Sequence, residues 1–207
     1  MSAKAPTDQP LTVGILALQG AYDAHARTLT ALGAIPRLVR TPAELDGPGG
    51  KIDGLIMPGG ESTTMLKFLE RGGFFEALQA FAQQKPVFGT CAGAILLARE
   101  VRNPTQRSLG LLDIAVERNA YGRQIDSAII TEPTSLPGGP LEMVFIRAPR
   151  IVQTGPHVEV LAHRDGFPVL IRQGRRLAAT FHPELSADHR VHKLFVDGVL
   201  SALQPVQ

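Results

Sequence analysis

The stretch VFGTCAGAILL, residues Val87–Leu97, decides the fold of this chain. One apolar run ends in it and another begins, and Gly89, Cys91 and Gly93 lie between the two. A short apolar run bounded by Gly or Pro is typical of a parallel strand that is buried on both faces. The second run fits a helix, so the stretch predicts a strand followed directly by a helix.

The same pattern recurs along the first half of the chain. Apolar runs with Gly or Pro at their ends occupy Leu11–Leu18, Gly54–Met57 and Pro86–Gly89. Helical patterns follow at Ala21–Leu32, Ser62–Glu70, Phe74–Gln83 and Cys91–Glu100. Alternating strands and helices with short links indicate an α/β protein with a mostly parallel sheet and right-handed crossovers.

The second half has a different pattern, with short strands joined by tight turns. We expect these strands at Leu112–Glu117, Ser127–Glu132, Leu141–Arg147, Val158–Ala162, Val169–Gln173 and Arg176–Phe181. They would add antiparallel ribbons to the sheet, and a last helix at Asp188–Leu203, capped by Asp188, would close the domain. The prediction is a single-domain, three-layer α/β sandwich over residues 11–203, after a flexible polar tail at residues 1–10.

Composition narrows the class of protein. The chain has 207 residues, a net charge of +2 and one cysteine. It has no basic run interleaved with aromatic residues, so nucleic acid is not an expected partner, and no apolar stretch approaches the roughly 20 residues of a membrane helix. The opening MSAKAPTDQP lacks the apolar core of a secretory signal, and a single cysteine fits a reducing compartment. We therefore expect a cytoplasmic protein.

Cys91 is a candidate nucleophile. Gly89-Thr90-Cys91-Ala92-Gly93 has the form of a nucleophile elbow, in which small neighbours let the chain turn tightly between a strand and a helix. The start of the following helix favours a thiolate and offers free backbone N–H groups, of which that of Ala92 is the natural oxyanion donor. The alternative is that Cys91 is a small buried apolar residue.

His182 is the candidate base for this thiol, because a thiol at its ordinary pKa is mostly protonated at neutral pH. It belongs to Phe181-His182-Pro183-Glu184, and the proline favours an extended conformation for His182. In an extended chain Glu184 would point to the same side and orient the imidazole, which predicts a Cys91-His182-Glu184 triad. The alternative is a simple turn after a strand.

The other histidines receive no catalytic role. His182, His189 and His192 could suggest a metal site, but no cysteine pair or HExxH pattern supports one, so no metal is expected. We expect His25, His157 and His163 to lie in loops or on exposed helix among polar residues.

Pro58-Gly59-Gly60 is a candidate oxyanion loop. It follows the apolar run GLIM and precedes the capped helical pattern ESTTMLKFLE, which predicts a position at the carboxyl edge of the parallel sheet, where such sheets bind ligands. Gly60 could give the second oxyanion donor. A phosphate-binding loop is the alternative, but Gly50-Lys51 is followed by Ile52 instead of Ser or Thr.

Six motifs together resemble a known enzyme family. They are LQG (Leu18–Gly20), PGGESTT (Pro58–Thr64), GTCAG (Gly89–Gly93), ERNAYGRQ (Glu117–Gln124), FIRAP (Phe145–Pro149) and TFHPEL (Thr180–Leu185). GTCAG with HPE resembles the triad, or class I, glutamine amidotransferases in general. The full set resembles the glutaminase subunits of pyridoxal phosphate synthase, and the likeness runs from about Leu11 to Leu200.

This resemblance implies a reaction and a partner. The reaction is hydrolysis of L-glutamine to glutamate and ammonia through a glutamyl thioester on Cys91. The partner is a synthase subunit that receives the ammonia in a hetero-oligomeric complex and builds pyridoxal 5'-phosphate from a pentose phosphate and a triose phosphate. No cofactor is implied for this chain.

The resemblance also implies a substrate site. The family's glutamine contacts fall on Gly60, Glu61, Ser62, Arg118, Ile146 and Arg147. A cation and paired polar groups suit the α-carboxylate and α-amine of a free amino acid. Arg118 and Arg147 could instead form ion pairs that hold the fold.

The chain departs from the family's pattern in its polar tail, in extra residues around Gly47–Lys51 and in Tyr121, which occupies an aromatic position. The resemblance implies weak activity until the synthase docks and the Gly59-Gly60 segment takes its donor geometry, and Gln19 is a candidate sensor of docking. Three other functions stay open: a glutaminase for another synthase, a cysteine peptidase or stress-response protein on a similar sheet, and an inert binding module.

Overall fold

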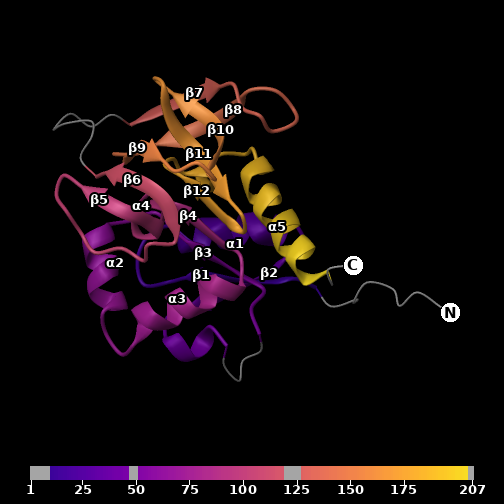
Figure 1. Ribbon diagram of the computed structural model, residues 1–207. Coiled ribbons are helices and arrows are strands. Elements are labelled where there is room, and N and C mark those ends of the chain that lie inside the picture. The colour runs from indigo at the N-terminus through magenta and orange to yellow at the C-terminus, as the bar shows by residue number, and fades with distance from the viewer. Residues whose placement is uncertain (1–9, 47–50, 119–126, 205–207) are drawn as a thin grey trace.

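A seven-stranded sheet forms the centre of the molecule (Figure 1). The computed structural model describes residues 10–46, 51–118 and 127–204. Most of the polar tail, most of the Gly47–Lys51 segment and Tyr121 lie outside the described residues. The strands of this sheet are β1 (Thr12–Leu16), β2 (Ile35–Val39), β3 (Gly54–Met57), β4 (Val87–Thr90), β10 (Glu159–Arg164), β11 (Phe167–Gln173) and β12 (Arg176–Ala179), in the order β10-β11-β12-β4-β3-β1-β2.

The sheet is parallel from β2 to β12 and antiparallel at one edge. β1, β2, β3, β4 and β12 run parallel to their neighbours, whereas β11 and β10 are antiparallel additions. This confirms the predicted mostly parallel sheet with antiparallel strands from the second half of the chain.

Helices cover both faces of the sheet, because alternate side chains of each buried strand point to opposite sides. Leu55, Met57 and Val87 pack against α2 (Ser62–Leu69), α3 (Phe74–Gln84) and α4 (Ala92–Leu97). Ile56 and Phe88, which alternate with them, pack against α1 (Tyr22–Ala31) and α5 (Arg190–Leu203). The result is the predicted three layers, and in Figure 1 α2 and α3 lie on one side of the strands and α5 on the other.

The smaller strands form two further sheets instead of extending the central one. β5 (Ala98–Arg102), β6 (Leu112–Glu117) and β9 (Arg150–Thr154) form one sheet, and β7 (Ala128–Glu132) pairs with β8 (Leu141–Phe145) in the other. Strands β2, β5 and β9 were not foreseen from the sequence. In the described part of the chain, two 3₁₀ turns complete the elements, η1 (Pro42–Glu44) and η2 (Pro183–Leu185).

The helix after Cys91 is shorter than predicted. It ends at Leu97, and the chain continues as β5. The carbonyls of Leu96 and Leu97 accept hydrogen bonds from the backbone N–H groups of Leu109 and Leu111, at 2.7 and 2.9 Å. A distant segment therefore satisfies the carbonyls at this helix end, and no local residue signals the end.

The last helix begins two residues later than predicted, at Arg190, so Asp188 is not its N-cap residue. The Asp188 carboxylate nevertheless supports the first turn, because it accepts from the Arg190 backbone N–H at 3.1 Å and pairs with the Arg190 guanidinium at 2.6 Å. Within the described part of the chain, no helix is long and apolar enough to cross a membrane.

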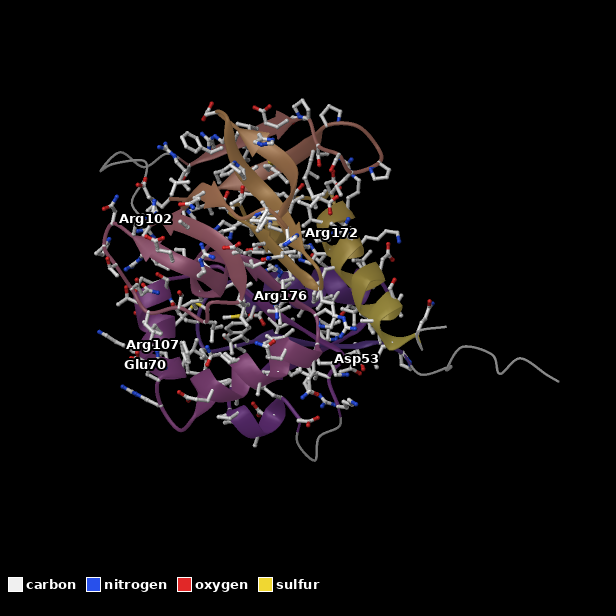
Figure 2. All side chains as sticks on the ribbon, in the orientation of Figure 1. Asp53, Glu70, Arg102, Arg107, Arg172 and Arg176 are labelled. Atoms are coloured by element: carbon white, nitrogen blue, oxygen red, sulfur yellow. The ribbon has the colours of Figure 1, made fainter. Side chains whose placement is uncertain are left out.

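Arg107 holds the segment after β5 against α2 and α3. Arg107 lies beside Glu70 in Figure 2, with 3.7 Å between guanidinium and carboxylate, and its Cζ is 3.8 Å from the centre of the Phe75 ring. Gln106, one residue earlier, accepts a hydrogen bond from the Ser62 hydroxyl at 3.1 Å. The Arg107 contacts therefore help to hold the first residue of α2 in place.

Candidate active site

Cys91 occupies a strained turn between β4 and α4. Its backbone angles are φ 48° and ψ −104°, a left-handed region that residues with side chains rarely adopt. Two backbone hydrogen bonds hold it there: Cys91 donates to the Ala179 carbonyl at 2.8 Å, and Ile95 donates to the Cys91 carbonyl at 3.2 Å. Such strain costs about 1–3 kcal/mol and persists only where the surroundings impose it.

The glycines on either side of Cys91 are required by close backbone packing. A Cβ atom at Gly93 would lie 2.0 Å from the Met57 carbonyl oxygen, and one at Gly89 would lie 2.6 Å from the Gly93 carbonyl carbon. Neither position has room for a methyl group. This geometry is that of the elbow predicted from the GTCAG motif.

The structure brings His182 and Glu184 together with the Cys91 turn. His182 Nδ1 lies 2.7 Å from Glu184 Oε1, and both residues are buried. The backbone N–H of His182 donates to the Val144 carbonyl at 2.8 Å, which fixes this segment beside β8.

The contact between His182 and Glu184 forms as predicted, but the predicted extended backbone is wrong. Pro183–Leu185 forms the 3₁₀ turn η2, which follows His182 directly. The turn brings the Glu184 carboxylate back towards the imidazole. The proline therefore begins a turn here instead of prolonging the strand.

Electrostatics at His182 favour the imidazolium. Burial lowers the pKa of His182, but hydrogen bonds and charge interactions with Cys91 and Glu184 outweigh burial and raise it to about 10. An imidazole with this affinity for a proton can take one from a neighbouring thiol.

Gly59 lies against both His182 and Cys91. A Cβ atom at Gly59 would lie 2.3 Å from His182 Cε1 and 3.2 Å from Cys91 Cβ. The two side chains therefore flank the same backbone segment, and they can approach each other because residue 59 has no side chain.

The LQG motif supports this glycine loop. A Cβ atom at Gly20 would lie 1.7 Å from the Gly59 carbonyl oxygen, so that carbonyl faces Gly20. Since C=O and N–H of one trans peptide point in opposite directions, the Gly60 N–H points away from Gly20. Gln19 Oε1 accepts a hydrogen bond from the Glu61 backbone N–H at 3.0 Å, which ties the next residue to the same motif.

Glu61 caps α2 and also contacts Arg118. Its carboxylate accepts from the backbone N–H groups of Thr63 and Thr64 at 3.0 and 2.7 Å. Hydrogen bonds from Thr64 and Thr63 outweigh desolvation and lower the pKa of Glu61 to about 2. Arg118 donates to the Thr63 hydroxyl at 2.7 Å and lies 3.5 Å from Glu61 Oε1. The ion pair considered for Arg118 is therefore present.

A hollow of about 310 Å³ opens beside the Cys91 turn. It is lined by Gln19, Gly60, Glu61, Ser62, Cys91, Ile95, Arg118, Ile146, Arg147 and His182. Every residue that the resemblance assigned to glutamine binding is among them. Glu184 and Ala92 do not line the hollow. Glu184 lies behind His182, and Ala92 is buried in α4.

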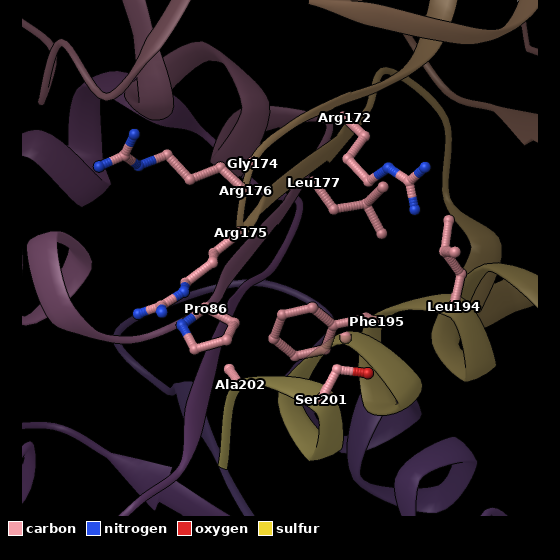
Figure 3. A pocket seen from close by; sticks show the side chains of 11 residues that line it. Pro86, Arg172, Gly174, Arg175, Arg176, Leu177, Leu194, Phe195, Ser201 and Ala202 are labelled. Atoms are coloured by element: carbon pink, nitrogen blue, oxygen red, sulfur yellow. The ribbon is translucent and has the colours of Figure 1, made fainter. Parts of the chain in front are cut away.

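A second hollow, of about 360 Å³, lies between β12 and α5 (Figure 3). Pro86, which precedes β4, contributes to it, so it is at the opposite end of that strand from Cys91. Arg175 and Arg176 donate to the carbonyls of Gln84 and Ala82, and Arg172 pairs with Glu159. None of the described residues that line this hollow is a cysteine or histidine, so it holds no thiol and imidazole pair like that of Cys91 and His182.

The expectation that His25 lies in a loop or on exposed helix among polar residues is wrong. His25 and His192 are both fully buried, and His25 Nδ1 lies 2.9 Å from His192 Nε2. Helical spacing could have revealed both, because His25 is four residues before buried Leu29 and His192 three before buried Phe195. Among the described residues no group of three or more His, Cys, Asp or Glu side chains could hold a metal ion.

Comparison with known proteins decides the family. Residues 15–201 match the SNO glutamine amidotransferase family. The chain belongs to this family. It is 60% identical to "Pyridoxal 5'-phosphate synthase subunit PdxT" of Koribacter versatilis, over 90% of this chain and 94% of that protein. The protein of the same name from Solibacter usitatus is 54% identical, over 89% and 97% of the two chains.

One solved structure agrees with the assignment to the glutamine amidotransferases, and a second shows the same fold. A crystal structure described as a glutamine amidotransferase matches with a TM-score of 0.81 and 43% identity, covering 90% of this chain and 98% of that one. A chain in the structure of PurLQS from Thermotoga maritima matches with a TM-score of 0.66 at 18% identity, covering 94% and 99%, and shows the shared fold alone.

Proposed function

We propose that this chain is the glutaminase subunit of a pyridoxal 5'-phosphate synthase, which hydrolyses L-glutamine to L-glutamate and ammonia. The observation that carries the proposal is the position of Cys91. Its backbone forms a strained turn beside the His182–Glu184 pair, and it lines a polar hollow. It occurs in a chain 60% identical to a protein named as a subunit of that synthase. We assign the activity to one domain, residues 11–203, in the cytoplasm.

The proposed reaction begins with proton transfer from the Cys91 thiol to His182 Nε2. The sulfur then attacks the side-chain amide carbon of glutamine, and a C–S bond forms while the C=O π pair moves to oxygen. The Gly60 and Ala92 N–H groups are the proposed donors to this oxyanion, and one such donor is worth about 3–4 kcal/mol in the transition state.

Collapse of the tetrahedral intermediate breaks the C–N bond. The His182 imidazolium gives its proton to the leaving nitrogen, so ammonia departs and a glutamyl thioester remains on Cys91. Water then attacks the thioester with His182 as base, and glutamate and the free thiol are regenerated. Glu184 keeps a proton on His182 Nδ1, so that Nε2 faces the sulfur.

The substrate is proposed to lie in the hollow with its amide towards Cys91. Arg118 and Arg147 would bind the α-carboxylate, and the Glu61 carboxylate, which stays ionised because its pKa is about 2, would bind the α-ammonium group. Ser62 and Ile146 complete the lining.

Ammonia is proposed to pass to a synthase subunit in a hetero-oligomeric complex. Gln19 is the candidate sensor of docking, because its amide oxygen holds the Glu61 N–H next to Gly60. A shift of Gln19 would move the backbone that carries the proposed oxyanion donor.

The test is glutamate release by this chain with and without the synthase subunit. We expect activity that rises when the synthase is added and that Cys91→Ala removes. Activation by the synthase subunit of another pathway would indicate a glutaminase for that synthase. Peptide cleavage without glutamine hydrolysis would indicate a cysteine peptidase or stress-response protein. A Cys91→Ala chain equal to wild type would indicate an inert binding module.

A further inference from the structure

A buried pair of histidines lies directly behind Glu184. His25 Nε2 is 3.5 Å from Glu184 Oε2, and neither side chain is exposed to solvent. His25 comes from α1, whereas its partner His192 comes from α5. Two helices on the same face of the sheet therefore meet at the carboxylate that contacts His182.

The two oxygens of Glu184 have different surroundings. Oε1 contacts His182 Nδ1 at 2.7 Å, whereas Oε2 is buried and has no hydrogen bond among the described residues. The imidazole of His25 faces this second oxygen. A buried carboxylate oxygen is stabilised when an N–H group donates a hydrogen bond to it.

The tautomers of the pair follow from which atoms would be left without a partner. If His25 carried its proton on Nδ1, His192 Nε2 would accept it, and His192 Nδ1–H would be a buried donor without an acceptor. Glu184 Oε2 would then face a bare nitrogen lone pair. With protons on Nε2 of both rings, His192 donates to His25 and His25 donates towards Glu184, and only an acceptor on His192 is left unpaired.

Thr90 is compatible with this arrangement. Its hydroxyl oxygen lies 3.3 Å from His25 Nε2, and a hydroxyl can accept a hydrogen bond as well as donate one. His25 Nε2–H can therefore donate to Thr90, the residue before Cys91, while it faces Glu184 Oε2 at 3.5 Å.

Both imidazoles are neutral in this arrangement. Burial, with His192 and His182 nearby, lowers the pKa of His25 well below its ordinary value, and burial together with His189 lowers that of His192 to about 3. Neutrality matters because a protonated His25 would compete with His182 for the charge of Glu184. A neutral donor orients the carboxylate and leaves its charge available to His182.

We propose that His25 is a positioning residue that holds Glu184 in line with His182 through an Nε2–H group, and that His192 fixes the tautomer of His25. This inference rests on the proposed glutaminase function. Neither histidine lines the hollow beside Cys91, so the pair acts on the reaction through Glu184 and leaves glutamine binding untouched.

The kinetic test compares His25→Leu with His25→Gln in the complete chain with the synthase subunit present. Leucine has no donor, and we expect kcat to fall at least tenfold while KM for glutamine stays within twofold. A glutamine side chain can donate from Nε2 and accept from His192, so His25→Gln should recover kcat to within about threefold of wild type. Thr28→Val is the matched control, because it removes another buried polar group from α1. In the described structure the Thr28 hydroxyl bonds only to the Ala24 carbonyl, so this change should leave kcat unchanged.

A spectroscopic test covers the case in which His25→Leu does not fold. The side-chain ¹⁵N shifts of the wild-type chain report which ring nitrogen carries the proton, and we expect Nε2–H on both His25 and His192. A proton on His25 Nδ1 would overturn the inference, and so would a folded His25→Leu chain with wild-type kcat or a His25→Gln chain no better than it. Failure of the proposed function is distinct, because wild type itself would then release no glutamate.

Discussion

Gly59→Ala tests whether His182 works from the position described. The added methyl group would lie 2.3 Å from His182 Cε1 and 3.0 Å from His182 Nδ1. Ordinary contact begins at about 3.4 Å, so the imidazole must move by about 1 Å or the glycine loop must shift by a similar amount. Movement of the imidazole disturbs the 2.7 Å contact between His182 and Glu184, whereas a shift of the loop displaces the proposed oxyanion donor at Gly60.

The expected loss follows from this displacement. A misplacement of about 1 Å in a catalytic group costs on the order of 10²-fold in rate, which is about 2.7 kcal/mol of transition-state stabilisation. Overpacking at a buried site typically costs about 1–3 kcal/mol in stability, so the chain should still fold. We therefore expect kcat near one-hundredth of wild type with a modest fall in Tm.

The assay is glutamate release with the synthase subunit present, together with the rate at which iodoacetamide alkylates Cys91. The chain has one cysteine, so the adduct reports on that thiol alone. Gly198→Ala is the matched control, since a Cβ atom there meets no atom within 4 Å and the residue lies in α5, where alanine is favoured by about 0.5–1 kcal/mol. A folded Gly59→Ala chain with kcat and alkylation rate within threefold of wild type would refute this reasoning.

Three further predictions concern the thiol, the carboxylate and the buried histidines. Cys91→Ala should abolish glutamate release and leave Tm within a few degrees, because alanine is smaller than cysteine and fits the same backbone turn; residual turnover above one per cent would exclude Cys91 as the nucleophile. Glu184→Gln should lower kcat less than His182→Asn does, because it leaves nucleophile and base in place, and the reverse order in the same assay would contradict these roles. The unfolding free energy from urea titration should fall when the pH is lowered from 6.5 to 5.5, because burial lowers the pKa of His25 and of His192 and both rings then take up protons mainly in the unfolded state. With an unfolded pKa of about 6.5, the fall is up to about 1 kcal/mol for each ring. His182 offsets a smaller part of this fall, because its raised pKa keeps it protonated in the folded state while its unfolded form still titrates. A flat profile would mean that the two rings are not buried as neutral groups.

The sequence by itself determined the features encoded within a few neighbouring residues. Gly89 and Gly93 predict the turn at Cys91, and in the structure a side chain at Gly93 would collide with Met57 and one at Gly89 with Gly93. The HPE motif predicts the contact between Glu184 and His182, although a 3₁₀ turn makes that contact in place of the expected extended chain. Continuous apolar runs likewise predict the buried parallel strands, since a strand covered on both faces has no polar side.

Only the tertiary structure decided what depends on distant segments. The helix after Cys91 ends at Leu97 because residues 109–111 bind its last carbonyls, and no local residue announces that end. The polarity of histidine suggested an exposed position for His25, but α1 and α5 pack so that it is enclosed with His192 behind Glu184. The meeting of thiol and imidazole is also long-range: parallel pairing of β4 with β12 sets Thr90 opposite Ala179, so Cys91 and His182 leave adjacent strands at the same edge of the sheet. Hydrogen bonds between strands far apart in the chain determine that register, so it cannot be predicted from the order of the residues alone.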